Sequence, residues 1–128
     1  MKRMVLIVSF LSCLAFGASE PERIVLPTNP QDYFEILSKK NSLCMRSGYV
    51  TLQPGQNIGF HDTGDFEELI IPFEGRGEME TKGAGRIAFE KGILIHAFPH
   101  AEHNVWNRGK DVLRYIYVVA DTKCGVSR

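Results

Sequence analysis

The sequence lacks several features that would assign it to a class at once. Its 128 residues carry no excess of charge, since 15 lysines and arginines face 15 aspartates and glutamates. It has no solenoid repeat, no low-complexity segment, and no apolar run of the roughly 20 residues that a membrane-spanning helix needs. No serine stands in a Gly-x-Ser-x-Gly elbow, and the glycines of residues 75–85 are not followed by the lysine-serine pair of a phosphate-binding loop. What remains is a single globular domain of ordinary composition, with 44% hydrophobic residues.

Residues 1–19 have the composition of a secretory signal peptide. Two basic residues come first, an apolar run follows from Met4 to about Phe16, and small residues come next. This order predicts cleavage after Gly17 or Ser19 and export to the periplasm or the medium. A membrane anchor is one alternative, but the apolar run is too short to span a bilayer. A lipoprotein linked through Cys13 is another, although "FLS" before it matches a lipobox only in part.

Removal of this leader leaves about 109 residues, which is enough to bury a core unaided. The leader takes two basic residues with it, so the mature part keeps 13 basic residues against 15 acidic ones. A slightly negative chain gives no electrostatic reason to expect nucleic acid or an anionic membrane as a partner.

Two cysteines remain after the leader, and they flank the main domain. Cys44 precedes its first strong strand signal and Cys124 follows its last. In a chain exported to an oxidising compartment, this placement predicts a disulfide. Two independent buried thiols are the alternative.

Residues 20–44 form an N-terminal arm ahead of the main domain at residues 45–128. The segment "RIVL" is compatible with a short strand, and "NPQDYFEILSKK" has the chemistry of a helix start. Asn29 suits an N-cap, Pro30 the first helical position, and Asp32 the first turn. We therefore expect one short helix or turn in the arm.

From Met45 onward, short apolar or alternating runs are separated by glycine-rich turns about every ten residues. This pattern predicts an all-β sandwich or barrel. Pro72 would interrupt a central ladder, so its strand should lie at an edge or carry a bulge there. Gly75 and Gly77 suit a tight turn between strands. The expected strands are "YVTL", "EELIIPF", "RIAF", "ILIHAF", "HNVW" and "VLRYIYVV".

All four histidines lie in the β region, and three of them fall within "HAFPHAEHN". Imidazoles together with a carboxylate suit a first-row transition metal. Any one of these histidines alone is more readily a surface or hydrogen-bonded residue than a metal ligand. The four are His61, His96, His100 and His103.

The spacing of two stretches strengthens the metal interpretation. The first runs Gly55, His61, Thr63, Glu68, Gly75, and the second runs Gly92, Phe98, His100, His103, Asn107. These spacings resemble the two motifs of the cupin family, a glycine, a His-x-His pair, a glutamate and a glycine, then a Gly…Pro-x-Gly…His…Asn block. Residues 76–91 match the short gap between the motifs of small cupins. The resemblance covers roughly residues 45–120.

This resemblance implies a double-stranded β-helix, the cupin or jelly-roll barrel, with a divalent metal inside it. His61, Glu68 and His103 fall on ligand positions of the motifs. Thr63 falls where the second histidine of the pair is expected, and a threonine hydroxyl is a poor ligand for transition metals. The second motif departs as well, with Phe98 in place of the proline and His100 in place of the glycine.

Three interpretations of Thr63 stay open. Two imidazoles and one carboxylate can bind a metal as a facial triad, as in non-haem iron(II) sites. His96 or His100 could instead supply a fourth ligand from the second motif. Alternatively, the site has lost its metal and keeps a pocket with a polar floor. If a metal binds, it is iron, manganese, nickel, copper or zinc.

Strand alternation predicts which side chains face inward. Residues two apart share a face, so His61 points the same way as Thr63, and Glu68 the same way as Ile70. Glu67 then faces outward with the neighbouring apolar residues, and Glu68 is the preferred ligand. Apolar residues on both faces of this strand suggest that the outer face packs on a second copy, as a homodimer.

A pocket for a small molecule is expected around these ligands. Tyr115 and Tyr117 alternate with apolar neighbours and either line the barrel or pack in its core. The predicted pocket residues are Thr63, His96, His100, Tyr115 and Tyr117. No nucleophile with a nearby base stands out, so the catalytic residues stay unassigned.

The leading functional hypothesis is a small exported cupin that binds a metal and acts on a small molecule, with oxygenase-like chemistry. Sugar isomerase or decarboxylase chemistry is equally compatible, because a fold does not fix a function. A non-catalytic module that binds a sugar or an organic acid is the main rival. A structural domain of the cell envelope is the third hypothesis.

Overall fold

The computed structural model describes residues 20–28 and 33–125 of the chain. Within these ranges the chain forms nine strands and no helix, so the described part contains no helix that could cross a membrane. The strands are β1 (Tyr33–Leu37), β2 (Met45–Leu52), β3 (His61–Asp62), β4 (Phe66–Glu74), β5 (Arg76–Thr81), β6 (Gly85–Glu90), β7 (Ile95–Ala97), β8 (Glu102–Trp106) and β9 (Leu113–Asp121).

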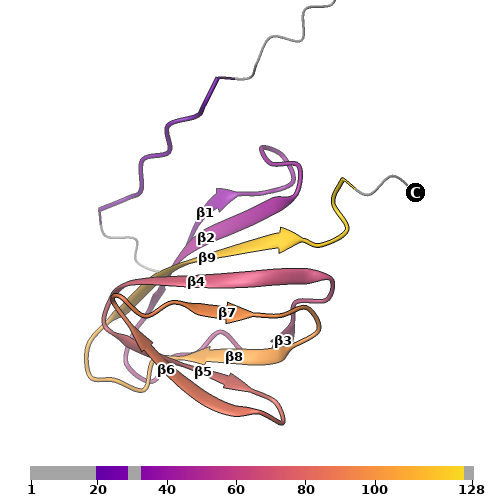
Figure 1. Cartoon of the computed structure of the whole chain (residues 1–128). Coiled ribbons are helices and arrows are strands. Elements are labelled where there is room, and N and C mark those ends of the chain that lie inside the picture. Colours follow the sequence, from indigo (N-terminus) through magenta and orange to yellow (C-terminus); the bar gives the residue numbers. More distant parts are fainter. Residues whose placement is uncertain (1–19, 29–32, 126–128) are drawn as a thin grey trace, which may run out of the picture.

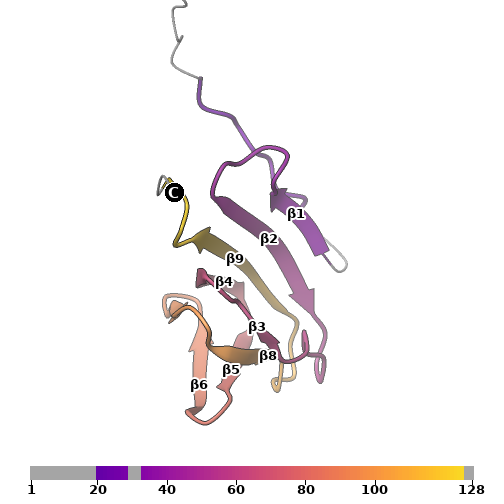
Figure 2. The ribbon, with the colours of Figure 1, turned by 90° about the vertical axis from the view of Figure 1, so that its right-hand side faces the viewer.

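The strands form two antiparallel sheets in which distant parts of the sequence become neighbours. One sheet has the order β1-β2-β9-β4-β7, and the other has the order β3-β8-β5-β6. Figure 1 shows the five-stranded sheet above the four-stranded one, and the view turned by 90° in Figure 2 shows the two sheets facing each other. The pairing of β3 with β8 places the two histidine-containing stretches side by side.

The expected helix in the arm is wrong where the structure describes it. Tyr33–Leu37 is a strand that pairs with β2, with Tyr33 opposite Val50 and Phe34 opposite Tyr49. Tertiary pairing with an apolar neighbour outweighs the weak local helix preference of these residues. The helix-start residues Asn29, Pro30 and Asp32 lie outside the described residues. Residues 23–26, expected as a possible strand, form none.

The two glycines predicted for a tight turn have different roles. Gly75 lies between β4 and β5 with φ of 75°, and a Cβ there would collide with the Val112 carbonyl. Gly77 lies inside β5, a strand that the sequence pattern did not reveal, and the rings and methyl groups of Phe89 and Leu113 fill the space of its missing side chain. Only Gly75 serves the turn, whereas Gly77 permits close packing.

The core lies between the two sheets. Ile70, Leu113 and Tyr115 from the first sheet meet Phe89 and Val105 from the second, and all five are almost completely buried. The rings of Phe89 and Tyr115 pack edge to face with centroids 6.2 Å apart. Burial of each such side chain contributes about 1.5–3 kcal/mol to the stability of the folded state. The core therefore holds the sheets together and leaves the interior open beside it, where the pocket described below lies.

Strand β4 is regular up to Pro72 and carries an irregularity just after it. Its pairing with β9 shifts register between Pro72 and Glu74, and β7 pairs only with the earlier residues Glu68–Ile70. Pro72 therefore needs no hydrogen-bond partner on the β7 side, and the predicted bulge is confirmed.

On the outer face of β4, the half-buried Leu69 and Ile71 lie opposite apolar residues of β9. The expectation of a homodimer rests on this outer face and stays a prediction.

A disulfide joins the two ends of the domain. Cys44, just before β2, bonds to Cys124, just after β9, with Cα atoms 5.6 Å apart and a sequence separation of 80 residues. The backbone nitrogen of Asp121 also donates a hydrogen bond to the Cys44 carbonyl. The bridge therefore closes the end of the β2–β9 pair.

Candidate metal centre and pocket

Three side chains with metal-binding atoms converge between the two sheets. His61 and His103 are direct partners in the β3–β8 pair, and Glu68 reaches them from β4 in the facing sheet. One ligand atom from each residue lies within 4.8 Å of the others. The Glu68 carboxylate is 2.8 Å from His103 Nε2 and 4.0 Å from His61 Nε2. This group could hold a metal ion.

Backbone carbonyls orient both imidazole rings in the same way. The His61 Nδ1 lies 3.0 Å from the Gly59 carbonyl, and the His103 Nδ1 lies 2.8 Å from the Ala101 carbonyl. A carbonyl only accepts, so each Nδ1–H donates and each Nε2 turns toward Glu68. Outer hydrogen bonds of this kind fix the tautomer of histidines that bind metals through the other nitrogen.

The contact between His103 and Glu68 favours the protonated form of the His103 imidazole. His103 is fully buried and Glu68 is 5% exposed. Burial lowers the pKa of the His103 imidazole, but the hydrogen bonds to Glu68 and Ala101 and the charge of Glu68 outweigh it, so the pKa is raised overall. Since Nδ1 already donates to a carbonyl, a proton on Nε2 makes the ring an imidazolium paired with the carboxylate. A bound cation would replace that proton.

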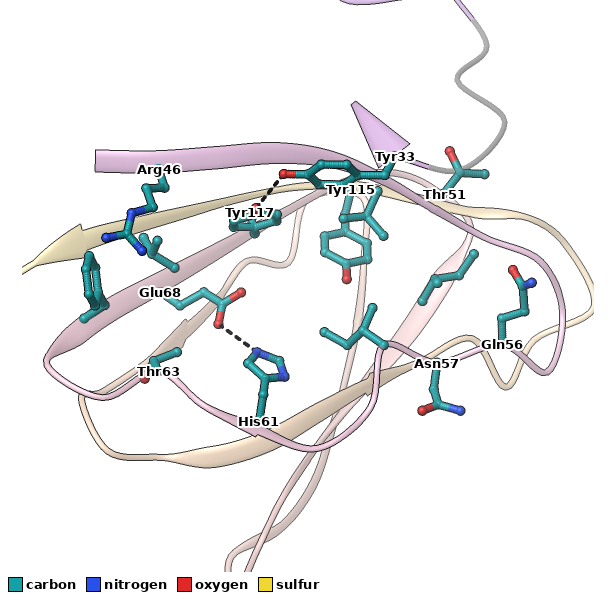
Figure 3. Close-up of a pocket in the computed structure, with 15 residues that line it drawn as sticks. Tyr33, Arg46, Thr51, Gln56, Asn57, His61, Thr63, Glu68, Tyr115 and Tyr117 are labelled. Atoms are coloured by element: carbon teal, nitrogen blue, oxygen red, sulfur yellow. Dashed lines mark hydrogen bonds and ion pairs between the residues drawn. The ribbon is translucent and has the colours of Figure 1, made fainter. Parts of the chain in front are cut away.

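A pocket of about 860 Å³ adjoins these residues. Figure 3 shows Glu68 and His61 in its middle, with Arg46 and Thr63 toward one end and Gln56 and Asn57 toward the other. The volume lies within the range of small-molecule sites. The lining residues are Tyr33, Arg46, Val50, Thr51, Leu52, Gln56, Asn57, Ile58, His61, Thr63, Phe66, Glu68, Tyr115, Tyr117 and Val119.

Three tyrosines form one wall of the pocket. The hydroxyls of Tyr33 and Tyr117 lie 2.9 Å apart, and the Tyr33 ring lies over Gly48, where a Cβ would collide with it. Burial, together with the charge of Glu68, raises the pKa of Tyr115. Burial and the hydrogen bond to Tyr33 raise that of Tyr117. Tyr115 and Tyr117 therefore keep their protons at neutral pH.

Thr63 lines the pocket as predicted, at the position where the cupin motif has a second histidine. Its hydroxyl is buried and has no hydrogen-bond partner in the structure. A buried hydroxyl without a partner costs free energy unless water or a ligand satisfies it. Thr63 thus offers a hydrogen bond to whatever occupies the space beside the three candidate ligands.

The prediction that His96 and His100 line the pocket is wrong. His96 is on the outer face and pairs with Glu67 at 3.4 Å, and His100 pairs with Asp65 at 3.2 Å. Strand alternation explains His96, which lies opposite the outward-facing Leu69. His100 occupies a left-handed turn with φ of 61°, the conformation suited to the glycine of the cupin motif. Neither histidine can serve as a fourth ligand from these positions.

Ten of the fifteen lining residues were not predicted, and Tyr33, Arg46, Gln56 and Asn57 are among them. Arg46 had a usable signal, because strand alternation puts it on the same face as Val50 and Leu52 once β2 is extended back to Met45. Tyr33 had none, because the local chemistry of its segment predicts a helix or turn. Gln56 and Asn57 belong to a loop, where periodicity gives no direction.

Comparison with known proteins gives a likeness of fold. No protein-family profile and no curated protein matches the sequence. Solved structures do match. An RmlC-like cupin family protein with a double-stranded β-helix fold from Methanocaldococcus jannaschii has a TM-score of 0.66 at 12% identity, over 80% of this chain and 94% of that one. A cupin 2 conserved barrel domain protein from Salinispora arenicola has a TM-score of 0.61 at 21% identity, over 83% and 92%.

The cupin domain of Schizosaccharomyces pombe Cnp3 has a TM-score of 0.64 at 14% identity. The match covers 71% of this chain and 64% of that one, which is under two thirds of its length. The predicted all-β architecture is confirmed, apart from the helix in the arm. The chain has the double-stranded β-helix fold of the cupin structures that it resembles.

Proposed function

We propose that this protein binds a divalent transition metal through His61, Glu68 and His103 and acts on a small molecule in the adjoining pocket. The observation that carries the proposal is the convergence of the three ligand atoms within 4.8 Å between two facing sheets. Two imidazoles and a carboxylate suit iron, manganese, nickel, copper or zinc, and the set matches a facial triad with open positions.

When bound, the metal would supply Lewis acidity or oxygen activation beside the pocket. The residues of the chain have distinct tasks around it. The Gly59 and Ala101 carbonyls hold the two imidazole rings, and the neutral hydroxyls of Tyr115 and Tyr117 offer protons for hydrogen bonds to a ligand. Thr63 leaves one side of the site free of a protein nitrogen, so a substrate group or a water can approach there.

A non-catalytic binding module is the second candidate, and Thr63 is the observation that favours it. Loss of one histidine of the cupin pair lowers the number of protein ligands. The large pocket would still bind a small molecule through its tyrosine, amide and histidine groups. Metal content separates the two candidates directly.

We expect His61→Ala to abolish near-stoichiometric metal binding in protein purified without an affinity tag. Loss of a side chain that binds the metal directly should weaken metal binding by at least 10- to 100-fold. That is the loss found when a hydrogen-bond partner of a metal ligand is removed. His61 suits this test because its side chain is 40% exposed and its loss leaves the Glu68–His103 contact in place. Elemental analysis and titration with Zn²⁺ measure the effect.

His96→Ala is the matched control, since it removes an imidazole–carboxylate contact on the outer face. It should bind the metal as tightly as the wild type. A wild-type protein without metal, whose ligand affinity does not change in chelator, would refute the metal proposal and favour the binding module.

We also propose export, with residues 1–19 as the leader. The Cys44–Cys124 disulfide supports this proposal, because such bonds persist in oxidising compartments. The mass of the protein isolated from its native cells should correspond to a chain that begins at residue 18 or 20. A mass that includes Met1 or its neighbours would contradict it.

A further inference from the structure

We infer that the ligand of the pocket is an organic acid whose carboxylate binds the guanidinium of Arg46 while its body lies along the pocket past Glu68. The inference names a ligand class and rests on the proposed function for the role of the metal. It is carried by the position of Arg46, by its lack of a carboxylate partner among the described residues, and by the charges around it.

Arg46 lies in the same row of the five-stranded sheet as Glu68. Both residues pair with Val119 of β9, Arg46 from β2 and Glu68 from β4. Residues in one row of a sheet share a face, so both side chains point to the interior. Their Cα atoms are two strands apart, about 10 Å. A small molecule can therefore contact Arg46 and the candidate metal ligands at once, with only the Val119 side chain between them on the sheet.

The guanidinium of Arg46 contacts an aromatic ring and makes no ion pair with any residue that the structure describes. Its central carbon lies 4.7 Å from the centroid of the Phe66 ring. Arg86, Arg108 and Arg114 each pair with a glutamate, whereas Arg46 pairs with no carboxylate among the described residues. A guanidinium stacked on a ring keeps its in-plane N–H groups free, in the fork that matches a carboxylate. Phe66 thus acts as a positioning residue for Arg46.

The charges of the pocket favour a single carboxylate. Among the lining residues, Arg46 is the only lysine or arginine, and Glu68 is the only carboxylate. A divalent cation would outweigh the charge of Glu68, and with Arg46 the wall would be positive. Arg46 is the one cationic side chain of the lining, and its single charge matches a carboxylate better than the double charge of a phosphate.

The other lining residues indicate the chemistry of the acid beyond its carboxylate. Val50, Leu52 and Ile58 supply apolar surface, and the amides of Gln56 and Asn57 lie toward the end opposite Arg46 (Figure 3). An acid with an apolar or aromatic body and a polar group at its far end fits this order. The raised pKa values of Tyr115 and Tyr117 keep their hydroxyls neutral, so both can donate hydrogen bonds to a ligand in the pocket.

The test compares acids with their neutral amides. Pyruvate, benzoate and 4-hydroxycinnamate, each paired with the matching amide, and inorganic phosphate are titrated into Zn²⁺-loaded and chelator-treated protein by ligand-observed NMR. We expect at least one acid to bind ten times more tightly than its amide. Arg46→Gln should bring that ratio to about one. Arg76→Gln, which removes an exposed arginine outside the pocket, should leave it unchanged.

Phe66→Leu is the second variant and should lower the acid preference several-fold by removing the platform under Arg46. It keeps the test decisive if Arg46→Gln does not fold, which thermal melting would reveal. Equal binding of acids and amides by the wild type overturns the inference, and so does a preference that survives Arg46→Gln. Arg46-dependent binding of phosphate above all acids overturns it as well.

The same samples separate this inference from the metal proposal. Zinc binding without a preference for acids leaves the metal site standing and removes the ligand class. A preference for acids that depends on Arg46 in protein unable to bind zinc supports the ligand class and removes the metal proposal.

Discussion

His103→Ala is expected to cost the metal-free protein about 3 kcal/mol of stability, in addition to abolishing metal binding. The fully buried His103 pairs at 2.8 Å with Glu68, which is 5% exposed. Removal of one partner from a buried ion pair leaves the other charge unpaired, at a cost of about 3–5 kcal/mol. We expect the lower end because Glu68 borders the pocket and can gain water. Urea unfolding of the chelator-treated proteins measures the difference.

The double variant Glu68→Gln/His103→Ala tests the cause of this loss. If an unpaired carboxylate is responsible, adding Glu68→Gln to His103→Ala should recover part of the stability, which a double-mutant cycle detects as a coupling above 0.5 kcal/mol. His96→Ala is the control, and it should lie within about 0.5 kcal/mol of the wild type because its contact with Glu67 is on the surface. A cost below 1 kcal/mol for His103→Ala would show that the pair is not a buried charge pair.

Much of the fold was predictable because strand alternation and motif spacing agree along most strands. Alternation in β4 predicts that Glu68 faces inward and Glu67 outward. In the structure Glu68 is buried and Glu67 is exposed. The histidine and glutamate spacing brought His61, Glu68 and His103 into one hypothesis although they lie on three strands of two sheets. Such spacing is informative when the turn lengths between strands are fixed by the fold.

The failures have local causes. Tyr33–Leu37 carries helix-start chemistry on its N-terminal side, yet the edge of β2 offers it a ladder of backbone hydrogen bonds and an apolar neighbour. His96 and His100 lie close to His103 in the sequence, but such proximity says nothing about the face that each side chain takes. Arg46 was missed because polar residues at the start of a strand look like loop residues until the pairing with β9 is known.

Loss of the disulfide is expected to have the largest effect on stability. In the double variant Cys44→Ser/Cys124→Ser, the unfolded chain regains the freedom of a loop closed across a separation of 80 residues. The chain-entropy model gives a loss of roughly 4 kcal/mol. With a urea m-value of about 2 kcal/mol/M, the midpoint of unfolding should fall by about 2 M.

Reduction provides the matched control for these serine substitutions. Wild type in a reducing agent should unfold at the same urea concentration as the double variant, and the variant should not respond to the reductant. Two free thiols in denatured, unreduced wild type would show that the bridge is absent.

The disulfide also lies close to the pocket residue Arg46. Arg46, on β2, follows Cys44 by two residues, and Cys124 lies just after β9, the strand that pairs with β2. If the disulfide fixes this end of β2, the variant should bind acids more weakly than the wild type even at temperatures where it is fully folded.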